Sequence, residues 1–543
     1  MTLKCVLVII FATLACRAAF PLDPGDLPKV RYQDGLGQLL VHGQPFLILG
    51  GELGNSSAGT AAQADAILPE LAKMHINTVL MPVAWNQVEP VEGRFDFSVL
   101  DHWIEVARVQ QMHLVILWFG SWKNGFSSYA PSWVLADTRR FPRAISAEGL
   151  PTETLSTLGA ETVHCDSRAF AALMHHVREM DADQQTILMI QVENEMGYVG
   201  LGGRDRSESA NREFNGAVPP ELLQNLQKRR LDLSPELAEH FNPSGHTWRE
   251  VFADAAGEVY MAWHYGRYVN AVADAGKKEY PLPMYLNAQL PSPLERAGEY
   301  PSGGPHPYFQ DVYRAVAPAI DFYSPDIYWP DFEYWVKRYV RAGNPAFVPE
   351  ARLDEAPFNA LYAYGSERAF GFSAFGVDSI QPANNDPAAG PALGEVYATL
   401  DHLKDEVLKA QQENRCRSLV LHKSSPRPTQ TIALGGYLFD ATLSRSWPAK
   451  TLLADDGAML VLQRDANEFY VVGSGLTVSI ARDPDTDNRI AGIANIDEMS
   501  FQDGRWIVSK ALNGDQTDQG RHLSLAPRSI HLYRVTLYSY DRN

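Results

Sequence analysis

Residues 186–195, which read TILMIQVENE, form an apolar run that turns polar only near its end. Strands that are apolar on both faces are typical of parallel sheets, because helices cover both faces of such a sheet. Seven more short runs of this kind lie between residues 46 and 375. The eight predicted strands are residues 46–51, 77–82, 113–119, 186–195, 283–287, 322–328, 346–351 and 370–375.

Longer amphipathic stretches alternate with these strands and predict eight helices. They are residues 64–74, 100–112, 167–182, 251–275, 307–318, 332–342, 357–364 and 392–414. Eight alternating strands and helices predict a (β/α)8 TIM barrel over residues 24–414. A doubly wound dinucleotide fold would need the G-x-G-x-x-G spacing after an early strand, and Gly50, Gly51 and Gly54 do not have it.

Two connections in this barrel are unusually long. The third strand ends near Gly120 and its helix begins near Ser167, while the fourth ends near Glu195 and its helix begins near Val251. Both are loops that follow a strand, so they lie at the carboxyl-terminal face of the barrel, where barrel enzymes hold their active sites. The second insertion is expected to contain a short helix at residues 221–230.

After residue 414 the pattern changes to short β-type runs separated by Gly, Asp and Asn. The runs are residues 417–422, 429–439, 458–463, 468–472, 476–481, 489–496, 506–508 and 529–540. They predict a C-terminal all-β sandwich over residues 415–543. Because no low-complexity linker precedes it, we expect this domain to pack directly on the barrel.

The composition is that of a globular, acidic protein. Hydrophobic residues make up 45% of the 543 residues and charged residues 21%, and 47 Lys and Arg face 65 Asp and Glu, a net charge of −18. Nucleic acid and anionic membranes need clustered positive charge, so neither is expected as a partner. After the N-terminal region, no segment has the ~20 unbroken apolar residues of a membrane span.

The N-terminal residues resemble an export signal. Residues 1–4 are positively charged, residues 5–15 are apolar, and Ala18 is suited to cleavage. We therefore expect a signal peptide at residues 1–18 and a periplasmic or extracellular protein. The alternative is an outer-membrane lipoprotein anchored at Cys16, because residues 14–16 resemble a weak lipid-attachment box.

Only Cys165 and Cys416 belong to the part of the chain beyond the signal. Two isolated cysteines make neither a disulfide framework nor a zinc site. Their expected positions at opposite faces of the barrel predict two free thiols. We expect no metal and no cofactor, since H-E-x-x-H and paired Cys/His spacings are absent from the sequence.

Two carboxylates end predicted strands. Glu195 ends the fourth strand and Glu350 lies near the end of the seventh. Strand ends converge over the barrel axis, so the two can face each other across one pocket. Such a pair is what glycosidic hydrolysis needs, because one group protonates the leaving oxygen while the other attacks the sugar or activates water. Strand alternation places Glu193 on the same face as Glu195, so the residues alone do not separate these two.

The sequence resembles glycoside hydrolase family 35 β-galactosidases over residues 44–414. The stretch Gln191-Val192-Glu193-Asn194-Glu195-Met196-Gly197 is similar to that family's strand-4 signature. Residues 83–90, VAWNQVEP, are similar to its strand-2 segment, and residues 131–133, PSW, to a landmark after strand 3. The resemblance implies a retaining mechanism in which Glu195 is the acid/base, Asn194 binds the sugar 2-hydroxyl and Glu350 is the nucleophile.

Further residues near strand ends are candidates for substrate binding. Aromatic side chains there can stack on a sugar ring, and polar ones can hold its hydroxyls. The candidates are Tyr328, Trp85, Trp118, Trp122, Trp329, Asn124, Glu52, Asn55 and Asp378. For Tyr328 two roles are open: a hydrogen bond that keeps Glu350 ionised, or packing alone.

One departure from family 35 concerns specificity. The family's Ala-Glu pair after strand 3 has no counterpart in Gly120-Ser121-Trp122-Lys123-Asn124. The sequence therefore predicts a secreted exo-acting β-galactosidase of a divergent subgroup, acting on galactosylated plant oligosaccharides such as xyloglucan side chains. The alternatives are another retaining β-glycosidase of the same clan, such as an endo-glucanase or mannanase, and a non-catalytic carbohydrate-binding protein.

Overall fold

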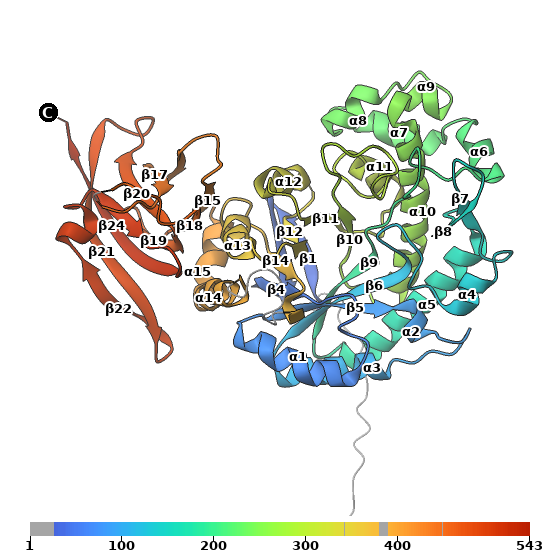
Figure 1. Cartoon of the computed structure of the whole chain (residues 1–543), viewed down its shortest axis with the longest axis horizontal. Coiled ribbons are helices and arrows are strands. Elements are labelled where there is room, and N and C mark those ends of the chain that lie inside the picture. The colour runs from blue at the N-terminus through green and yellow to red at the C-terminus, as the bar shows by residue number, and fades with distance from the viewer. Residues whose placement is uncertain (1–26, 342, 380–388, 448, 543) are drawn as a thin grey trace, which may run out of the picture.

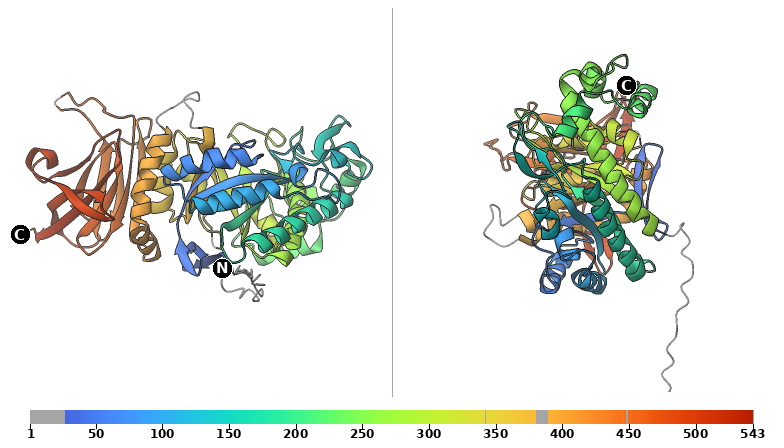
Figure 2. Two further views of the ribbon diagram at one scale, coloured as in Figure 1. Left: turned by 90° about the horizontal axis from the view of Figure 1, so that it is seen from below. Right: turned by 90° about the vertical axis from the view of Figure 1, so that its right-hand side faces the viewer.

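A computed structural model describes residues 27–341, 343–379, 389–447 and 449–542. The expected signal peptide and Cys16 lie outside these residues. The molecule is elongated, with an α/β barrel at one end and a β domain at the other (Figure 1). Helices stand between the strands of the barrel and the β domain, which Figure 2 shows in its left view as the yellow and orange ribbons.

All eight predicted barrel strands are present, and they are parallel. They are β4 (Ile48–Glu52), β5 (Thr78–Ala84), β6 (His113–Lys123), β9 (Ile187–Asn194), β10 (Met284–Gln289), β11 (Phe322–Ile327), β12 (Phe347–Val348) with β13 (Glu350–Ala351), and β14 (Gly371–Phe375). The seventh strand is in two pieces because it breaks at Pro349, whose ring nitrogen has no N–H to donate. Since β12 pairs with β14 and β13 pairs with β11, these two pieces close the barrel.

The barrel helices follow the predicted order. They are α1 (Ala61–Lys73), α3 (Ser98–Val109), α5 (Ala160–Asp181), α10 (Ala256–Glu279), α11 (Gln310–Val316), α12 (Phe332–Tyr339), α13 (Ala356–Gly365), and α14 (Ala389–His402) with α15 (Lys404–Gln412). The last pair corrects the prediction of one helix over residues 392–414. The helix ends at His402, and the next one begins after Leu403.

A three-stranded antiparallel sheet, which the sequence pattern did not predict, precedes the barrel. It consists of β1 (Lys29–Gln33), β2 (Leu36–Val41) and β3 (Gln44–Phe46). Leu39 and Val41 of β2 belong to the same buried cluster as Val115, Phe322 and the other side chains that fill the barrel interior. The sheet therefore closes one end of that interior, opposite to the end where the strand-to-helix loops lie.

The long loops contain their own small elements, as their length predicts. A short helix α2 (Trp85–Val88) follows β5. The insertion after β6 holds α4 (Ser132–Ala136) and the hairpin β7 (Arg143–Ile145) and β8 (Pro151–Leu155). The insertion after β9 holds α6 (Glu208–Phe214), α7 (Pro220–Lys228), α8 (Pro235–His240), α9 (Trp248–Phe252) and the turn η1 (Ala253–Ala255). Helix α7 confirms the one predicted at residues 221–230, and a further turn, η2 (Val377–Ser379), follows β14.

The C-terminal domain is a sandwich of two antiparallel sheets. One has the order β15 (Cys416–His422), β18 (Asp456–Gln463), β19 (Glu468–Ser474), β24 (His531–Asp541), β21 (Arg489–Gln502) and β22 (Arg505–Leu512). The other has the order β16 (Thr429–Leu434), β17 (Tyr437–Leu443), β20 (Leu476–Arg482) and β23 (His522–Leu525), and a turn η3 (Gly514–Thr517) precedes β23. Residues 429–439, predicted as one strand, fold as two because the chain turns at Gly435 and Gly436, which both have φ above +60°.

Strands β15, β18 and β19 of the six-stranded sheet are buried on both faces, whereas β21 and β22 are mostly half-buried or exposed. In β18, Met459 and Val461 point into the sandwich, while Leu460 and Leu462 join the core that the barrel helices form. At the junction, the Ser366 N–H at the end of α13 donates to Ser418 Oγ at 2.9 Å, and Ser366 Oγ donates to the Ser418 carbonyl at 2.7 Å. The predicted direct packing of the β domain on the barrel is confirmed.

Two further predictions concern thiols and membranes. Cys165 and Cys416 are both buried and unpaired, which confirms the predicted free thiols. Among the described residues, no helix has the length and apolar character that crossing a membrane requires.

Candidate active site

The carboxylates of Glu195 and Glu350 meet over the carboxyl-terminal end of the barrel. Glu195 directly follows β9, and Glu350 opens β13 on the other side of the barrel. One oxygen of each, together with one of Asp326 from β11, lies within 4.8 Å of the others. Both side chains are buried, with 2% and 4% of their residue surface exposed. The structure therefore brings the two predicted carboxylates together, as convergence of the strand ends requires.

Glu350 is held by two neighbouring side chains. Tyr328, which follows β11, donates its hydroxyl hydrogen to Glu350 Oε1, and Glu52 at the end of β4 is hydrogen bonded to the same carboxyl. Burial and the negative charge of Glu195 raise the pKa of Glu350 to about 7, although Lys123 and these two hydrogen bonds oppose the rise. The structure thus contains the hydrogen bond that is one of the two roles predicted for Tyr328.

Glu195 faces two residues at the end of β6. Asn124 Nδ2 donates a hydrogen bond to Glu195 Oε2, and Lys123 Nζ lies 3.6 Å from the same oxygen. The register between β6 and β9 shifts between Trp118 and Lys123, so that Lys123 pairs with Asn194. Irregularities of this kind re-aim side chains next to active sites, and this one brings Lys123 and Asn124 to the pocket.

Glu193 and Glu195 have different hydrogen-bond partners. This difference distinguishes the two glutamates, which the residue pattern alone could not do. The Glu193 carboxylate accepts the backbone N–H groups of Ser121 at 3.1 Å and Trp122 at 2.8 Å. Its φ is +61° and that of Glu195 is +44°, both in the left-handed region. The regular alternation of a strand therefore fails here, and the expectation that both side chains share one face is wrong.

The Glu193 carboxyl is part of a buried polar cluster behind the pocket. Asp166 of α5 accepts hydrogen bonds from Trp118 Nε1 at 3.0 Å and Ser121 Oγ at 2.7 Å. Burial and the neighbouring Asp166 raise the pKa of Glu193 well above its usual value. The cluster ties the end of β6, and with it Lys123 and Asn124, to the helix layer.

Asn194 ends β9 and is completely buried. Neither its amide nitrogen nor its amide oxygen has a hydrogen-bond partner among the described residues. A buried amide without partners is costly, so a ligand hydroxyl that bonded to it would remove that cost. This is the property expected of a residue that binds substrate.

Three residues of the pocket were missed by the sequence analysis: Lys123, Asp326 and Asn287. Asn287 Oδ1 accepts the backbone N–H of Glu195 at 2.9 Å, and its Nδ2 donates to Asp326 Oδ2 at 2.7 Å. Burial and the neighbouring carboxylates of Glu350 and Glu195 raise the pKa of Asp326 well above its usual value. All three are polar residues at or near strand ends, which is the signal that could have found them.

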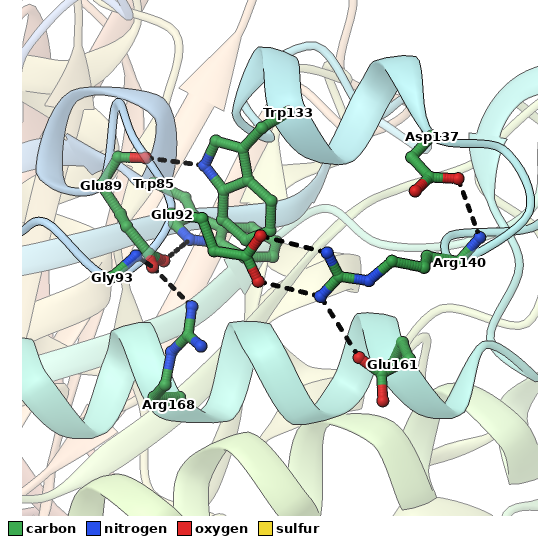
Figure 3. Close-up of polar contacts among 9 residues, drawn as sticks. All are labelled: Trp85, Glu89, Glu92, Gly93, Trp133, Asp137, Arg140, Glu161 and Arg168. Carbon is green, nitrogen blue, oxygen red and sulfur yellow. Dashed lines mark hydrogen bonds and ion pairs between the residues drawn. The ribbon is translucent and has the colours of Figure 1, made fainter.

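Trp85 does not line the pocket, which corrects its prediction as a stacking residue. Its side chain is fully enclosed, and its indole N–H donates to Glu89 Oε2 at 2.9 Å. Glu89 in turn accepts Arg168 of α5 at 2.5 Å and the Gly93 N–H at 2.6 Å, as Figure 3 shows. Trp85 therefore belongs to a cluster that fastens the loop after β5 to the neighbouring helix.

The other predicted tryptophans differ in exposure. Trp122 is fully buried and donates its indole N–H to the Leu155 carbonyl at 3.1 Å, so it too has no face free for a sugar. Trp329 is half-buried, and its indole N–H donates to the Leu290 carbonyl at 3.0 Å. Because Trp329 directly follows Tyr328, it remains a candidate for stacking on substrate.

The loop after β4 carries Asn55 and is fixed by Asp378. The Asp378 carboxylate accepts the Gly54 N–H at 2.8 Å and the Ser57 hydroxyl at 2.5 Å. Asn55 is half-buried, and its Oδ1 has no partner among the described residues. Asp378 thus shapes this loop, and Asn55 is the member of the loop with a free acceptor.

Two family models match separate parts of the chain. A glycoside hydrolase model (Glyco_hydro_42), described as "Beta-galactosidase", matches residues 57–234, about a third of the chain. This stretch contains Glu195 but ends before Glu350. A second model, described as "Domain of unknown function (DUF5597)", matches residues 393–524, from α14 to the start of β23. No curated protein sequence matches the chain.

Solved structures that resemble the chain include two β-galactosidases and a mannanase. A polyextremophilic β-galactosidase from the Antarctic haloarchaeon Halorubrum lacusprofundi is 12% identical, with a TM-score of 0.44 over 65% of this chain and 58% of that one. A cold-adapted β-galactosidase from Rahnella sp. R3 is 14% identical, with a TM-score of 0.44 over 66% and 56%. A β-mannanase from the blue mussel Mytilus edulis is 11% identical, with a TM-score of 0.42 over 69% and 97%.

These comparisons support a likeness to β-galactosidases but not to family 35 in particular. The alignments span less than two thirds of the two β-galactosidase chains. The matching family model is the family 42 β-galactosidase, so the specific resemblance to family 35 is not supported. The barrel and the paired carboxylates of Glu195 and Glu350 are consistent with the glycoside hydrolase model that matches residues 57–234.

Proposed function

We propose that this protein is an exported, retaining β-galactosidase that removes terminal β-galactosyl residues from oligosaccharides. The observation that carries the proposal is the approach of the buried Glu195 and Glu350 carboxyls, with one oxygen of each within 4.8 Å. Retaining glycosidases hold their two carboxyl groups about 5–5.5 Å apart, whereas inverting ones need about 6.5–9.5 Å for an intervening water. The short separation supports double displacement.

In the first step Glu350 is the nucleophile and Glu195 the acid. A Glu350 oxygen forms a bond to the anomeric carbon while the bond from that carbon to the leaving oxygen breaks. The proton of Glu195 passes to the leaving oxygen, so the aglycone departs as a neutral alcohol. Tyr328 and Glu52 support this step, because their hydrogen bonds favour the ionised form of Glu350.

In the second step water attacks the anomeric carbon and releases Glu350. Glu195, now ionised, takes the proton of that water, and the free sugar leaves with its original anomeric configuration. Asn124 and the backbone bond to Asn287 hold Glu195 in place through both steps. Asn194 supplies the buried amide that would bond the sugar 2-hydroxyl.

A panel of 4-nitrophenyl glycosides tests this function directly. The wild type is expected to hydrolyse the β-galactoside at least ten times faster than the β-glucoside and β-mannoside, with retention of configuration by proton NMR. Strong activity on another sugar with little on the galactoside would favour another β-glycosidase. Inversion would contradict double displacement.

A matched pair of variants links this activity to the site. Glu350→Gln should abolish turnover on every substrate of the panel. Glu153→Gln changes an exposed glutamate of β8 in the same way and should retain it. Full activity of Glu350→Gln would mean that the reaction takes place elsewhere. If the wild type binds these sugars but does not hydrolyse them, the protein is a carbohydrate-binding protein instead of an enzyme.

A further inference from the structure

Lys123 is a buried cation in the centre of the carboxyl groups. Its residue surface is 7% exposed, and Nζ lies 3.6 Å from Glu195 Oε2 and 5.4 Å from the centre of the Phe119 ring. Burial disfavours its charge, but the four carboxyls that face it raise its pKa above the usual value. These four are Glu52 of β4, Glu195 after β9, Asp326 of β11 and Glu350 of β13.

Two of these four carboxyl groups are in surroundings that disfavour their ionised forms. Burial and the neighbouring Glu350 raise the pKa of Glu52 well above its usual value, and burial does the same for Asp326. The other two are Glu195 and Glu350, and in a retaining glycosidase one of this pair is protonated when substrate binds. The pair then carries one negative charge, next to the positive charge of Lys123.

We propose that Lys123 is the fixed positive charge that balances the single negative charge of the Glu195–Glu350 pair while that charge moves from Glu350 to Glu195 during sugar transfer. The proposal rests on the retaining mechanism proposed above. Lys123 acts through the two carboxylates, so it is a positioning residue.

The movement of charge follows from the balance of the reaction. Before transfer Glu350 is an anion and Glu195 carries a proton. When the Glu350 oxygen bonds to the anomeric carbon, Glu350 becomes a neutral ester, and the proton that Glu195 gives to the leaving oxygen makes Glu195 the anion. Hydrolysis by water reverses both changes, and the ammonium of Lys123 remains unchanged throughout.

The position of Lys123 suits this task. It lies next to Glu195, which is the anion of the covalent intermediate, and it also acts on Glu350, where it opposes the rise in pKa. Oxygens of Glu195, Asp326 and Glu350 lie within 4.8 Å of one another, and such a cluster of carboxyl oxygens favours a cation. The ammonium group of Lys123, at the end of β6, supplies that cation permanently.

The pH profile of kcat/KM tests the proposal. A nearby opposite charge lowers a carboxyl pKa by about 1–3 units, so Lys123→Met should move the acid limb, set by Glu350, to higher pH by about one unit or more. Lys123→Arg keeps the charge and should leave the midpoint of this limb near that of the wild type, even if kcat changes.

Two outcomes would overturn the proposal. A rise in KM with an unmoved acid limb would make Lys123 a ligand of the sugar. A fall in kcat with an unmoved acid limb would make its role structural. If Lys123→Met does not fold, Lys123→Gln, which is neutral but polar, takes its place in the same measurement.

A titration without substrate separates this inference from the proposed function. Carbon-13 NMR of glutamate carboxyls can follow Glu350, assigned as the resonance lost in Glu350→Gln. Its midpoint should rise by about one unit or more in Lys123→Met relative to the wild type and Lys123→Arg. An unchanged titration midpoint of Glu350 in Lys123→Met would refute the proposed electrostatic role of Lys123. A wild-type protein that is inactive on β-galactosides would refute only the proposed β-galactosidase function.

Discussion

Glu193 and Glu195 are two positions apart at the end of one strand, yet their carboxyl groups contact entirely different residues. Glu193 accepts two backbone N–H groups at the end of β6, behind the pocket, while Glu195 faces Lys123 and Asn124 inside it. The left-handed backbone of both residues produces this separation. Such conformations are costly for residues other than glycine and concentrate at functional sites.

The different surroundings of the two glutamates predict different effects of the same Glu→Gln substitution, on catalysis at position 195 and on stability at position 193. Glu195→Gln should lower kcat by about 10²–10⁴ on a β-galactoside with a poor leaving group, because a general acid is lost. Glu193→Gln should retain much more activity but reduce the unfolding free energy by about 1–3 kcal/mol, because the amide nitrogen cannot accept one of the two backbone N–H groups that the carboxyl oxygens of Glu193 accept. Kinetics and thermal unfolding of both variants check this, and equal kinetic losses would contradict the assignment.

Tyr328 should influence the acid limb of the pH profile. Its hydrogen bond lowers the pKa of Glu350, which stands at about 7 with that bond in place. Tyr328→Phe removes the bond, so the pKa rises, and the nucleophile is protonated over a wider range. We expect the acid limb of kcat/KM to move to higher pH, with a larger loss of activity at pH 6.5 than at pH 8.5. An unmoved limb would mean that Tyr328 does not act through Glu350.

The raised pKa of Glu350 should also affect stability. Its pKa is about 7 in the folded protein against an ordinary value of 4.5, so its contribution to stability is fully present below pH 4.5 and lost as the pH rises through 7. The shift corresponds to on the order of 3 kcal/mol. Glu350→Gln should therefore unfold at a higher temperature than the wild type at pH 8, and the difference should shrink towards pH 4.5. A difference independent of pH would contradict this.

The two thiols offer a test of the packing between helices and domains. Cys165 and Cys416 are 1% and 0% exposed, and burial raises the pKa of Cys416 to about 12. In protein produced without residues 1–23, a thiol reagent at pH 8 should react with neither cysteine quickly in the native state and with both after denaturation. Fast native reaction of Cys416 would show that the β domain separates readily from the barrel.

The strands of the barrel could be predicted because each is buried on both faces. Their apolar runs are nearly continuous, and the residues that end them converge over one pocket, so the pairing of Glu195 with Glu350 follows from the sequence pattern. The sheet of β1, β2 and β3 was missed because its first strand, KVRYQ, is polar and exposed. The break between α14 and α15 was missed because the amphipathic pattern continues through Leu403.

The details of the pocket depend on backbone geometry that a pattern of residue types does not contain. The third strand was expected to end at residue 119, but it continues to Lys123 through a shift in register. That shift brings Lys123 and Asn124 to Glu195. Trp85 and Trp122 lie at the predicted strand ends, but their indoles are turned inward to protein acceptors.

The most direct test of the account is to trap the covalent intermediate. A 2-deoxy-2-fluoro-β-galactosyl fluoride should inactivate the protein, because the fluorine slows both steps while the good leaving group still allows the first. Digestion and mass spectrometry should then find one fluorogalactosyl group on Glu350, in the peptide that contains residues 347–352. A label on Glu195 or on any other residue would contradict the assignment of Glu350 as the nucleophile.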